Sequence, residues 1–562
     1  MNADRLLEHY ERIADAPDAI ARLRRFILDL AVRGKLVPQD ASDEPASELL
    51  KRIAKEKARL AKAGEIKDKS LPPVDEDAEF DVPPTWRWTR LGTVTSYIQR
   101  GKSPKYAASE GSLVVSQKCV QWRGLDLSVA KQITVESLAD YEDIRFLRDG
   151  DLLWNSTGTG TIGRIIRLVE PPEKLVCDSH VTVVRCLEVE PEYIRIWLRS
   201  DHVFELIEGR AAGSTNQVEL TAQMAINQVV PLPPLAEQYR IVAKVDELMA
   251  LCDRLEAARA GREAARDRLA AASLARLNAP DPESFQADAR FALHALPALT
   301  ARPDQIKALR QTILNLAVRG KLVPQDANDE PASELLKGIA ADKAERAISA
   351  RDRRATKIRQ LVGDGVPFPL PSNWVWASFG DITISRDGER IPVSREDREQ
   401  RAKVYDYYGA SGVIDKIDGF LFDKPLLLIG EDGANLINRS TPIAFIARGK
   451  YWVNNHAHVL DGLSEGFLRY VELFINAIDL KPYVTGTAQP KMNQAKMNSI
   501  PVALPPLAEQ HRIVAKIDAL MALCDRLEAS LTATAATRRR LLDALLAEAL
   551  APADDRELEA AE

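Results

Sequence analysis

The chain contains one unit twice, and this duplication constrains the fold more than any other feature of the sequence. Residues 30–51 and 316–337 differ at a single position. Residues 232–257 return as residues 504–529 with three changes. The distance between equivalent blocks far exceeds the roughly 20–50 residues of a solenoid repeat, so a whole unit has been duplicated.

The two copies diverge between the repeated blocks. A tryptophan pattern opens each diverged segment, as PPTWRWTRLG at 83–92 and PSNWVWASFG at 371–380. The residues that follow, 93–231 and 381–503, share little visible similarity. Nearly identical blocks are typical of a chain that presents one surface twice, whereas diverged segments favour two different targets. Drift after a recent duplication is the simpler alternative, but drift alone would not spare two separated blocks.

Length and composition allow several cored domains. The 562 residues are 46% hydrophobic, and no run of about 18 apolar residues is present to cross a membrane. The N-terminus lacks the basic start and apolar stretch of a signal peptide. The five cysteines show no CxxC spacing, which argues against a disulfide framework and a zinc site. We therefore expect a cytoplasmic protein with no membrane contact.

The net charge of −6 counts against a simple basic nucleic-acid binder, whose affinity comes mainly from lysine and arginine neutralising phosphates. DNA binding stays open, because basic loops can lie on an acidic scaffold and a partner can supply positive charge.

The repeated blocks are predicted to be helical. Apolar residues between 20 and 30 follow helical spacing, and Gly34 is expected to end that helix. A second helix is expected over about 45–62, with Ser42 or Asp43 as its N-cap.

Each Pro-Pro pair, at 233–234 and 505–506, precedes a long helix of about 40 residues, or roughly 60 Å. Apolar residues there alternate by four and three, which predicts a heptad seam. Ordinary core packing is the alternative, and it is the expected role of Cys252 and Cys524 on the seams.

The diverged segments combine short stretches rich in β-branched residues with short helical stretches. We therefore expect an α+β chain in which two mixed α/β domains alternate with long helices, in a pseudo-two-fold internal duplication. The expected segments are a helical region at 1–82, a mixed domain at 83–231, a long helix at 232–278, a linker at 279–303, a second helical region at 304–366, a second mixed domain at 367–503 and a second long helix at 504–562.

No motif predicts catalysis or a metal site. GTGTIG at 158–163 matches a dinucleotide-binding pattern, but the residues that follow it favour a strand rather than the helix such a site needs. An enzyme with a nucleotide-dependent domain at 93–231 is therefore disfavoured, and a tight turn or a DNA-facing turn is preferred. His456 and His458 have no third candidate metal ligand beside them.

Polar loops in both diverged segments carry residue types that contact bases and phosphates. The candidates in the first segment are Arg100, Lys102, Lys105, Tyr106, Gln117, Lys118, Gln121, Arg123, Ser156, Thr157, Thr159, Ser214, Thr215, Asn216 and Gln217. Those in the second are Arg386, Arg390, Tyr407, Tyr408, Ser411, Asn435, Asn454, Asn455, His456, Thr487, Gln489, Lys491 and Asn493. Any one such loop is usually a solvated turn. The clustering of these loops within the diverged segments is what favours a role in DNA binding.

The paired PxxWxWxxxG and LPPLAEQxRIVxKxD elements resemble those of the specificity subunit of type I restriction–modification systems, over nearly the whole chain. The stretch from Tyr407 to Asn435, with WVNNHAHVL after it, is similar to a target recognition domain of that family.

The resemblance implies that each mixed domain reads one half of an asymmetric double-stranded DNA site. The long helices would pack as antiparallel coiled-coil spacers that hold the two readers about one helical turn apart. Two adenine methyltransferase subunits would dock on the repeated helices, and restriction subunits could join them. The candidate partner-binding residues are Glu237, Gln238, Arg240, Glu509, Gln510 and Arg512.

The resemblance also implies that S-adenosylmethionine, ATP and Mg²⁺ belong to the partner subunits, so that this chain is not an enzyme and holds no cofactor. The alternative from a different class is a scaffold without DNA, in which helices join two ligand-binding β domains.

Overall fold

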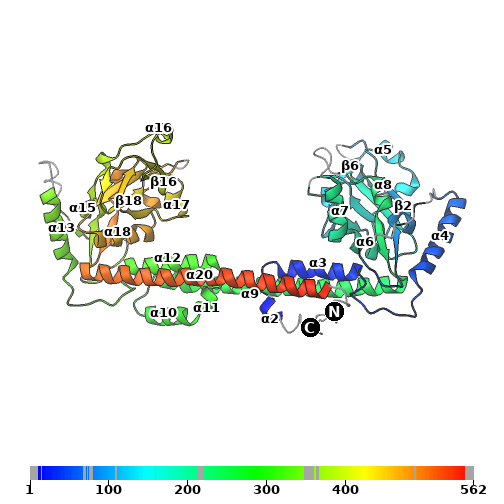
Figure 1. Cartoon of the computed structure of the whole chain (residues 1–562), viewed down its shortest axis with the longest axis horizontal. Coiled ribbons are helices and arrows are strands. Elements are labelled where there is room, and N and C mark those ends of the chain that lie inside the picture. Colours follow the sequence, from blue (N-terminus) through cyan, green and yellow to red (C-terminus); the bar gives the residue numbers. More distant parts are fainter. Residues whose placement is uncertain are drawn as a thin grey trace. The chain divides into compact units, whose positions relative to one another are not determined.

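The two copies of the repeat form two separate units in the computed structural model (Figure 1). The first unit is residues 1–261 and 535–562, and the second is residues 262–534. The structure describes residues 10–13, 15–66, 71–72, 74, 80–107, 111–158, 160–211, 219–346, 358, 360–362, 366–486 and 489–550. Each unit therefore combines most of one copy with the end of the other copy's long helix.

The predicted long helices are present, and each has 44 residues. One begins in the first unit and ends in the second, while the other begins in the second and ends in the first. The helices outside the mixed domains are α2 (Tyr10–Ile13), α3 (Ala19–Val32), α4 (Ala46–Lys62), α9 (Leu235–Asn278), α10 (Phe285–His294), α11 (Leu296–Leu299), α12 (Pro303–Val318), α13 (Ala332–Arg346) and α20 (Leu507–Leu550).

A short helix lies along the start of each long helix, α3 along α9 and α12 along α20 (Figure 1). Arg24 of α3 donates to Asp253 and Glu256 of α9 at 2.6 and 2.8 Å. Arg310 of α12 makes the equivalent two bonds to α20, at 2.7 and 3.1 Å. The heptad seams therefore pack against the short helix and the mixed domain of their own unit.

Two details differ from expectation. The segment at 279–303, expected to be a linker, contains α10 and α11, which pack against the end of α9 within the second unit. Helix α4 starts after Pro45 without a side-chain cap. The two expected caps are used elsewhere, because Ser42 donates to Asp40 and Asp43 accepts from Arg240. Cys252 and Cys524 are buried free thiols, which confirms that they fill the core.

The mixed domain of the first unit contains a four-stranded antiparallel sheet and a three-stranded sheet. The first has the order β2 (Thr95–Arg100), β10 (Val181–Cys186), β7 (Leu152–Asn155), β8 (Ile165–Arg167). The second has the order β6 (Lys131–Ile133), β3 (Ser112–Val115), β9 (Val176–Cys177), and its β3–β9 pair is parallel. The remaining elements are the hairpin β4 (Val120–Gln121) and β5 (Gly124–Leu125) and the helices α5 (Val135–Ala139), α6 (Pro191–Leu198), α7 (Asp201–Ala211) and α8 (Ala222–Asn227).

The four-stranded antiparallel sheet of the second mixed domain has the same strand order as that of the first, despite the different sequence. Its antiparallel sheet is β14 (Ile384–Ser385), β21 (Ala457–Asp461), β18 (Leu426–Gly430), β19 (Ala444–Ala447). Its other sheet is β16 (Gly412–Ile417), β15 (Tyr405–Gly409), β20 (Lys450–Val453), β17 (Phe422–Asp423), again with one parallel pair, β15–β20. Its helices are α15 (Phe379–Ile382), α16 (Arg395–Glu399), α17 (Asn435–Asn438), α18 (Glu465–Ala477) and α19 (Gln494–Asn498).

Each mixed domain begins and ends in neighbouring strands. Strand β1 (Arg87–Arg90) pairs with β11 (Val229–Leu232), and β13 (Val375–Ser378) pairs with β22 (Pro501–Leu504), both antiparallel. Strand β12 (Gln360–Leu361) adds to the second pair. Because both strands of a pair lead directly from and into the repeated blocks, the diverged residues form an insertion held at its base.

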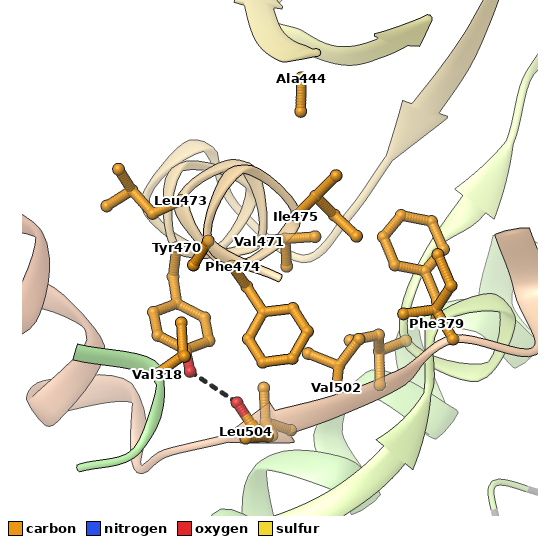
Figure 2. Close-up of a cluster of buried hydrophobic side chains, with 14 of the residues drawn as sticks. Val318, Phe379, Ala444, Tyr470, Val471, Leu473, Phe474, Ile475, Val502 and Leu504 are labelled. Carbon is orange, nitrogen blue, oxygen red and sulfur yellow. Dashed lines mark hydrogen bonds between the residues drawn. The ribbon is translucent and has the colours of Figure 1, made fainter. Parts of the chain in front are cut away.

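A continuous apolar core joins each mixed domain to its helices. In the second unit, α18 packs Val471 and Phe474 against Val502 and Leu504 of β22 (Figure 2). The hydroxyl of Tyr470 donates to the carbonyl of Ala503 at 2.6 Å, and Tyr193 bonds to β11 in the same way in the first unit. No helix within the described residues is long and apolar enough to span a membrane.

The glycine of each repeated RGK turn lies against the proline that opens the tryptophan pattern. Gly34 and Gly320 follow α3 and α12 with φ values of 69° and 66°. A Cβ atom on Gly34 would lie 2.4 Å from Pro83 Cγ, and one on Gly320 would lie 2.6 Å from Pro371 Cγ. Glycine is therefore required both by the left-handed backbone and by the close approach of the proline.

We predict that Gly34→Ala lowers the free energy of unfolding of the first unit by about 2–3 kcal/mol, because strain and a clash coincide. Gly64→Ala is the matched control, since Gly64 has φ 75° but nothing within 4 Å of its Cβ position. That control is expected to cost only about 1–2 kcal/mol. Urea denaturation measures both, and equal losses would contradict the proposed clash.

Candidate nucleic-acid interface

Three segments of the first mixed domain meet beyond the end of strand β7. The amide of Ser156 donates to the carbonyl of His180 at 2.9 Å, and the amide of Leu220 donates to the carbonyl of Ser156 at 2.8 Å. The Thr157 hydroxyl lies 2.7 Å from His180 Nδ1. Thr221 then caps the N-terminus of α8. We call this meeting point the first loop junction.

The second mixed domain builds the same junction beyond strand β18 from other residue types. The amide of Glu431 donates to the carbonyl of His456, and the amide of Met492 donates to the carbonyl of Glu431, both at 2.8 Å. His456 Nδ1 lies 2.7 Å from the carboxylate of Asp432. Asn493 caps α19. The second loop junction has the same pattern of backbone hydrogen bonds as the first, and each junction includes a histidine at the equivalent position.

The first loop junction is surrounded mainly by amides and hydroxyls. The carbonyl of Gln117 accepts from Asn155 Nδ2 at 3.0 Å, and its side-chain oxygen accepts from the Thr157 hydroxyl at 3.2 Å. Gln121 accepts from Arg164 at 3.1 Å. These groups can donate to and accept from base edges in a groove.

The second loop junction is surrounded by ion pairs. Arg390 lies 3.0 Å and Lys491 lies 3.2 Å from the carboxylate of Glu431. His458 Nδ1 lies 2.6 Å from Asp387. Burial raises the pKa of Asp387, but the hydrogen bond and charge of His458, the amide of Val459 and the charge of Arg390 together outweigh it, so this pKa lies below its ordinary value.

The structure brings several predicted residues to the two junctions. Gln117, Gln121 and Thr157 lie at the first, and Arg390 lies at the second. The candidates exposed to solvent are Lys105, Tyr106, Lys118, Arg123, Ser411, Asn455, His456, Gln489, Lys491 and Asn493.

Three candidates are corrected by their burial, because their side chains have no surface to offer DNA. Ser156 is 0% exposed and its hydroxyl lies 2.5 Å from that of Thr182. Tyr407 is 1% exposed and accepts from the amide of Val393. Asn454 is 5% exposed and accepts from the amide that follows it by two residues. All three support the loops rather than face outward.

Other candidates contact segments outside the junctions. Lys102 donates to the carbonyl of Asp140, the amide of Lys105 to Ser137, and Asn435 to Thr441. The further contacts are Tyr106 with Lys131, Arg123 with Asp126, Arg386 with Glu389 and Asp461, and Tyr408 with Phe445. Arg100, in contrast, lies at the first loop junction, where it pairs with Glu219 and donates to the carbonyl of Ser179. The candidates Thr159, Ser214, Thr215, Asn216, Gln217 and Thr487 lie outside the described residues.

Sequence reasoning missed His180 and the roles of Asp387 and His458. A signal for His180 was available, because DSHVTVV and NNHAHVL can be aligned at His180 and His456 just before a strand. In both domains the first residue of that pattern, Asp178 or Asn454, accepts from the histidine amide. Asp387 gave no such signal, since its partner lies 71 positions away.

The GTGTIG segment is followed by strand β8, which confirms that no dinucleotide-binding helix starts there. Among the residues that the structure describes, no group of three or more His, Cys, Asp or Glu side chains is placed to hold a metal ion.

The predicted partner-binding residues have structural roles instead. Glu237 is fully buried, and it accepts from Trp86 Nε1 at 3.0 Å and from Gln39 Nε2 at 2.5 Å. Gln238, also fully buried, donates to the carbonyl of Pro233. Arg240 pairs with Asp43 at 2.6 Å. Burial raises the pKa of Glu237, and the two donors partly offset that cost.

The second copy repeats this arrangement around Glu509, with Trp374 at 2.9 Å and Gln325 at 2.6 Å. Gln510 donates to Pro505, and Arg512 pairs with Asp329 at 2.5 Å. Folding within each unit thus explains the four buried residues, whereas Arg240 and Arg512 keep 37% and 38% of their side chains exposed.

The chain is similar to several known proteins. Residues 371–535 match the family model described as the type I restriction modification DNA specificity domain. The chain is 30% identical over 572 residues to the EcoAI specificity subunit of Escherichia coli, a type I restriction enzyme subunit, covering 94% of this chain and 93% of that protein. It is 29% identical over 576 residues to the EcoEI specificity subunit of Escherichia coli, covering 94% of each. A solved structure of the HsdS subunit from Thermoanaerobacter tengcongensis covers 84% of this chain at 19% identity, with a TM-score of 0.43.

The chain therefore belongs to the specificity subunits of type I restriction–modification systems, which confirms the resemblance seen in its sequence. As a member of that family it is a specificity subunit and not a catalytic one.

We predict that Trp86→Phe lowers the stability of the first unit by about 1–3 kcal/mol, because it removes a donor from the buried Glu237 carboxylate. Trp374→Phe should cost the second unit a similar amount, and the double variant should show both losses. Thermal or urea denaturation monitored by fluorescence tests this, and an unchanged midpoint for either variant would refute the role of the bond.

Proposed function

We propose that this chain recognises an asymmetric bipartite DNA site, with one half read by each mixed domain. The observation that carries the proposal is the pair of loop junctions, which share one backbone arrangement but present different side chains. An equivalent scaffold with different polar groups is what two readers of different sequences require.

The chemistry of the junctions supports different half-sites. Amides such as Gln117 and Gln121 suit adenine, whereas Lys491 and Arg390 suit guanine. Acidic groups such as Asp432 can accept from the amino group of cytosine. The net charge of −6 then requires that partners supply part of the positive charge around the DNA.

The same proposal assigns the chemistry to partner subunits in the cytoplasm. Two methyltransferase subunits would use S-adenosylmethionine to methylate an adenine flipped out of the duplex, and restriction subunits would use ATP and Mg²⁺. The relatives named above are subunits of type I restriction enzymes, which supports partners of this kind.

A surface for a partner present twice should be both exposed and identical in the two copies. On the long helices several positions meet both conditions, and four of these form one group on a helical face, because 3.6 residues per turn places residues 243, 250, 251 and 254 within about 100° of one another. They are Ala243, Ala250, Leu251 and Arg254 on α9 and Ala515, Ala522, Leu523 and Arg526 on α20. Leu251 and Leu523 are 42% and 45% exposed, so the two copies offer apolar surface at equivalent positions.

The function is tested by gel shift with and without a co-expressed methyltransferase, followed by methylome sequencing of the host. Sequence-selective binding and a methylated bipartite motif are expected. Absence of any methylated motif, with binding to no duplex, would favour the scaffold without DNA.

We predict that Gln489→Ala relaxes the sequence requirement in one half of the methylated site and leaves the other half unchanged. A lost bidentate base contact should reduce discrimination by roughly 1–3 kcal/mol. Gln117→Ala, in the other domain, is the matched variant and should relax the opposite half. Methylome sequencing reads both halves at once, and a change in both halves by either variant would exclude the assignment.

We predict that Leu251→Asp and Leu523→Asp each reduce the number of bound methyltransferase subunits from two to one, because each buries a charge in one of two equivalent interfaces. Tyr239→Ala is the control, since Tyr239 is 55% exposed on the same helix but is replaced by His511 in the other copy. Native mass spectrometry counts the subunits. Two bound subunits with the leucine variants would show that the partner docks elsewhere.

A further inference from the structure

His458 lies beneath the second loop junction in a setting that requires a doubly protonated ring. Its side chain is 2% exposed. Nδ1 lies 2.6 Å from the Asp387 carboxylate, and Nε2 lies 2.9 Å from the carbonyl oxygen of Met492. Both partners can only accept hydrogen bonds, because the pKa of Asp387 is lowered and a carbonyl has no proton. Both ring nitrogens must therefore donate.

The charged groups around His458 come from three segments. Asp387 lies in the short helix η4 (Asp387–Glu389), and Arg390 follows it. Glu431 lies 4.0 Å from Nδ1, while Arg390 lies 3.6 Å from Asp387 and 3.0 Å from Glu431. Lys491 reaches Glu431 from the third segment. The imidazolium thus bridges the η4 segment to residues 489–493, where Gln489 and Lys491 are exposed.

A neutral ring could satisfy only one of its two acceptors. If the remaining proton stays toward Asp387, the carbonyl of Met492 faces a lone pair inside a buried site, since Met492 is 0% exposed. An unsatisfied buried acceptor costs about 1–3 kcal/mol. Residues 489–493 would therefore lose the hydrogen bond from His458 that holds them in place.

The first mixed domain has a threonine at the position equivalent to His458. Strand pairing of Val181 with Asn155 and of Ala457 with Gly430 places Thr182 and His458 at equivalent positions. Thr182 makes a hydroxyl contact with Ser156 at 2.5 Å, and this contact does not titrate near neutral pH. The two domains therefore differ at the support of the same loop.

We propose that protonated His458 is a positioning residue that holds residues 489–493 for base reading, so that alkaline pH weakens recognition by the second domain and not by the first. The part that concerns DNA rests on the function proposed above. The positioning of the loop is a property of the chain alone.

The direction with pH follows from the surroundings of His458. Burial lowers its pKa, but Asp387, the carbonyl of Met492 and the charge of Glu431 together raise it more, so the pKa in the folded chain lies above the ordinary value of about 6.5. The stabilisation is therefore complete below about pH 6.5 and is lost as pH rises through the raised value.

Amide hydrogen exchange of the full chain between pH 6 and pH 9 tests the positioning, with rates corrected for intrinsic exchange. Peptides covering 489–493 should lose protection about tenfold or more in one step above pH 6.5, while those covering 219–221 stay constant. His458→Gln should abolish the step. Asp387→Asn, which keeps the side-chain shape, should move the step to lower pH, and His456→Gln should leave it in place.

A flat protection profile in the unmodified chain would overturn the proposal, as would a step that persists in His458→Gln or disappears in His456→Gln. These outcomes need no knowledge of the DNA target. The test also survives if one variant fails to fold, because the protection profile of the unmodified chain alone can overturn the proposal.

A DNA arm uses the chain with its methyltransferase partner and duplexes that carry the methylated motif, with base changes confined to one half. Raising the pH from 6.5 to 9 should reduce discrimination about tenfold in the half read by the second domain only. Equal loss in both halves, or no loss, would overturn the inference. Absence of sequence-selective binding at every pH would instead overturn the proposed function.

Discussion

A buried carboxylate at the start of each long helix holds each unit together. Glu237 ties the first turn of α9 to Trp86, which opens the mixed domain, and to Gln39, which follows α3. Three segments far apart in the sequence therefore meet at one side chain. A buried carboxylate without donors would be costly, so the tryptophan and the glutamine are needed wherever the glutamate is present. Glu509 repeats the arrangement, which explains why these positions match in both copies.

With its base fixed in this way, the diverged part of each unit can change without loss of the fold. The strand order of the antiparallel sheet, the presence of one parallel pair in the other sheet and the backbone bonds of the loop junctions are the same in both mixed domains. Backbone hydrogen bonds do not depend on side-chain identity, so Ser156 can correspond to Glu431 and Thr157 to Asp432. The side chains around the frame are then free to differ, as different targets require.

The helices of the repeated blocks and several central strands could be predicted from sequence because their signals are local. Heptad spacing gave α9 and α20, and β-branched stretches gave β7, β10, β18 and β21. The junctions could not be predicted, because each joins three segments separated by tens of residues and the bonds are made by backbone atoms. Polar composition alone therefore selected Ser156 and Tyr407, which are buried, and passed over His180.

The identical residues of the long helices show a related limit. Identity between the copies pointed to Glu237 and Gln238 as partner contacts, but identity also arises from a shared internal structure. Exposure to solvent distinguishes residues kept for a partner from residues kept for folding. By this criterion Leu251 and its exposed neighbours are the better candidates for partner contact.

The central claim, that each mixed domain reads its own half-site, is tested most directly by a chain that carries the second domain twice. Residues 93–231 would be replaced by residues 381–503, and the methylated motif would be read by sequencing the host genome. The account predicts a motif whose two halves have the same sequence, namely the half assigned to the second domain by Gln489→Ala. An unchanged asymmetric motif from a folded, active complex would contradict it.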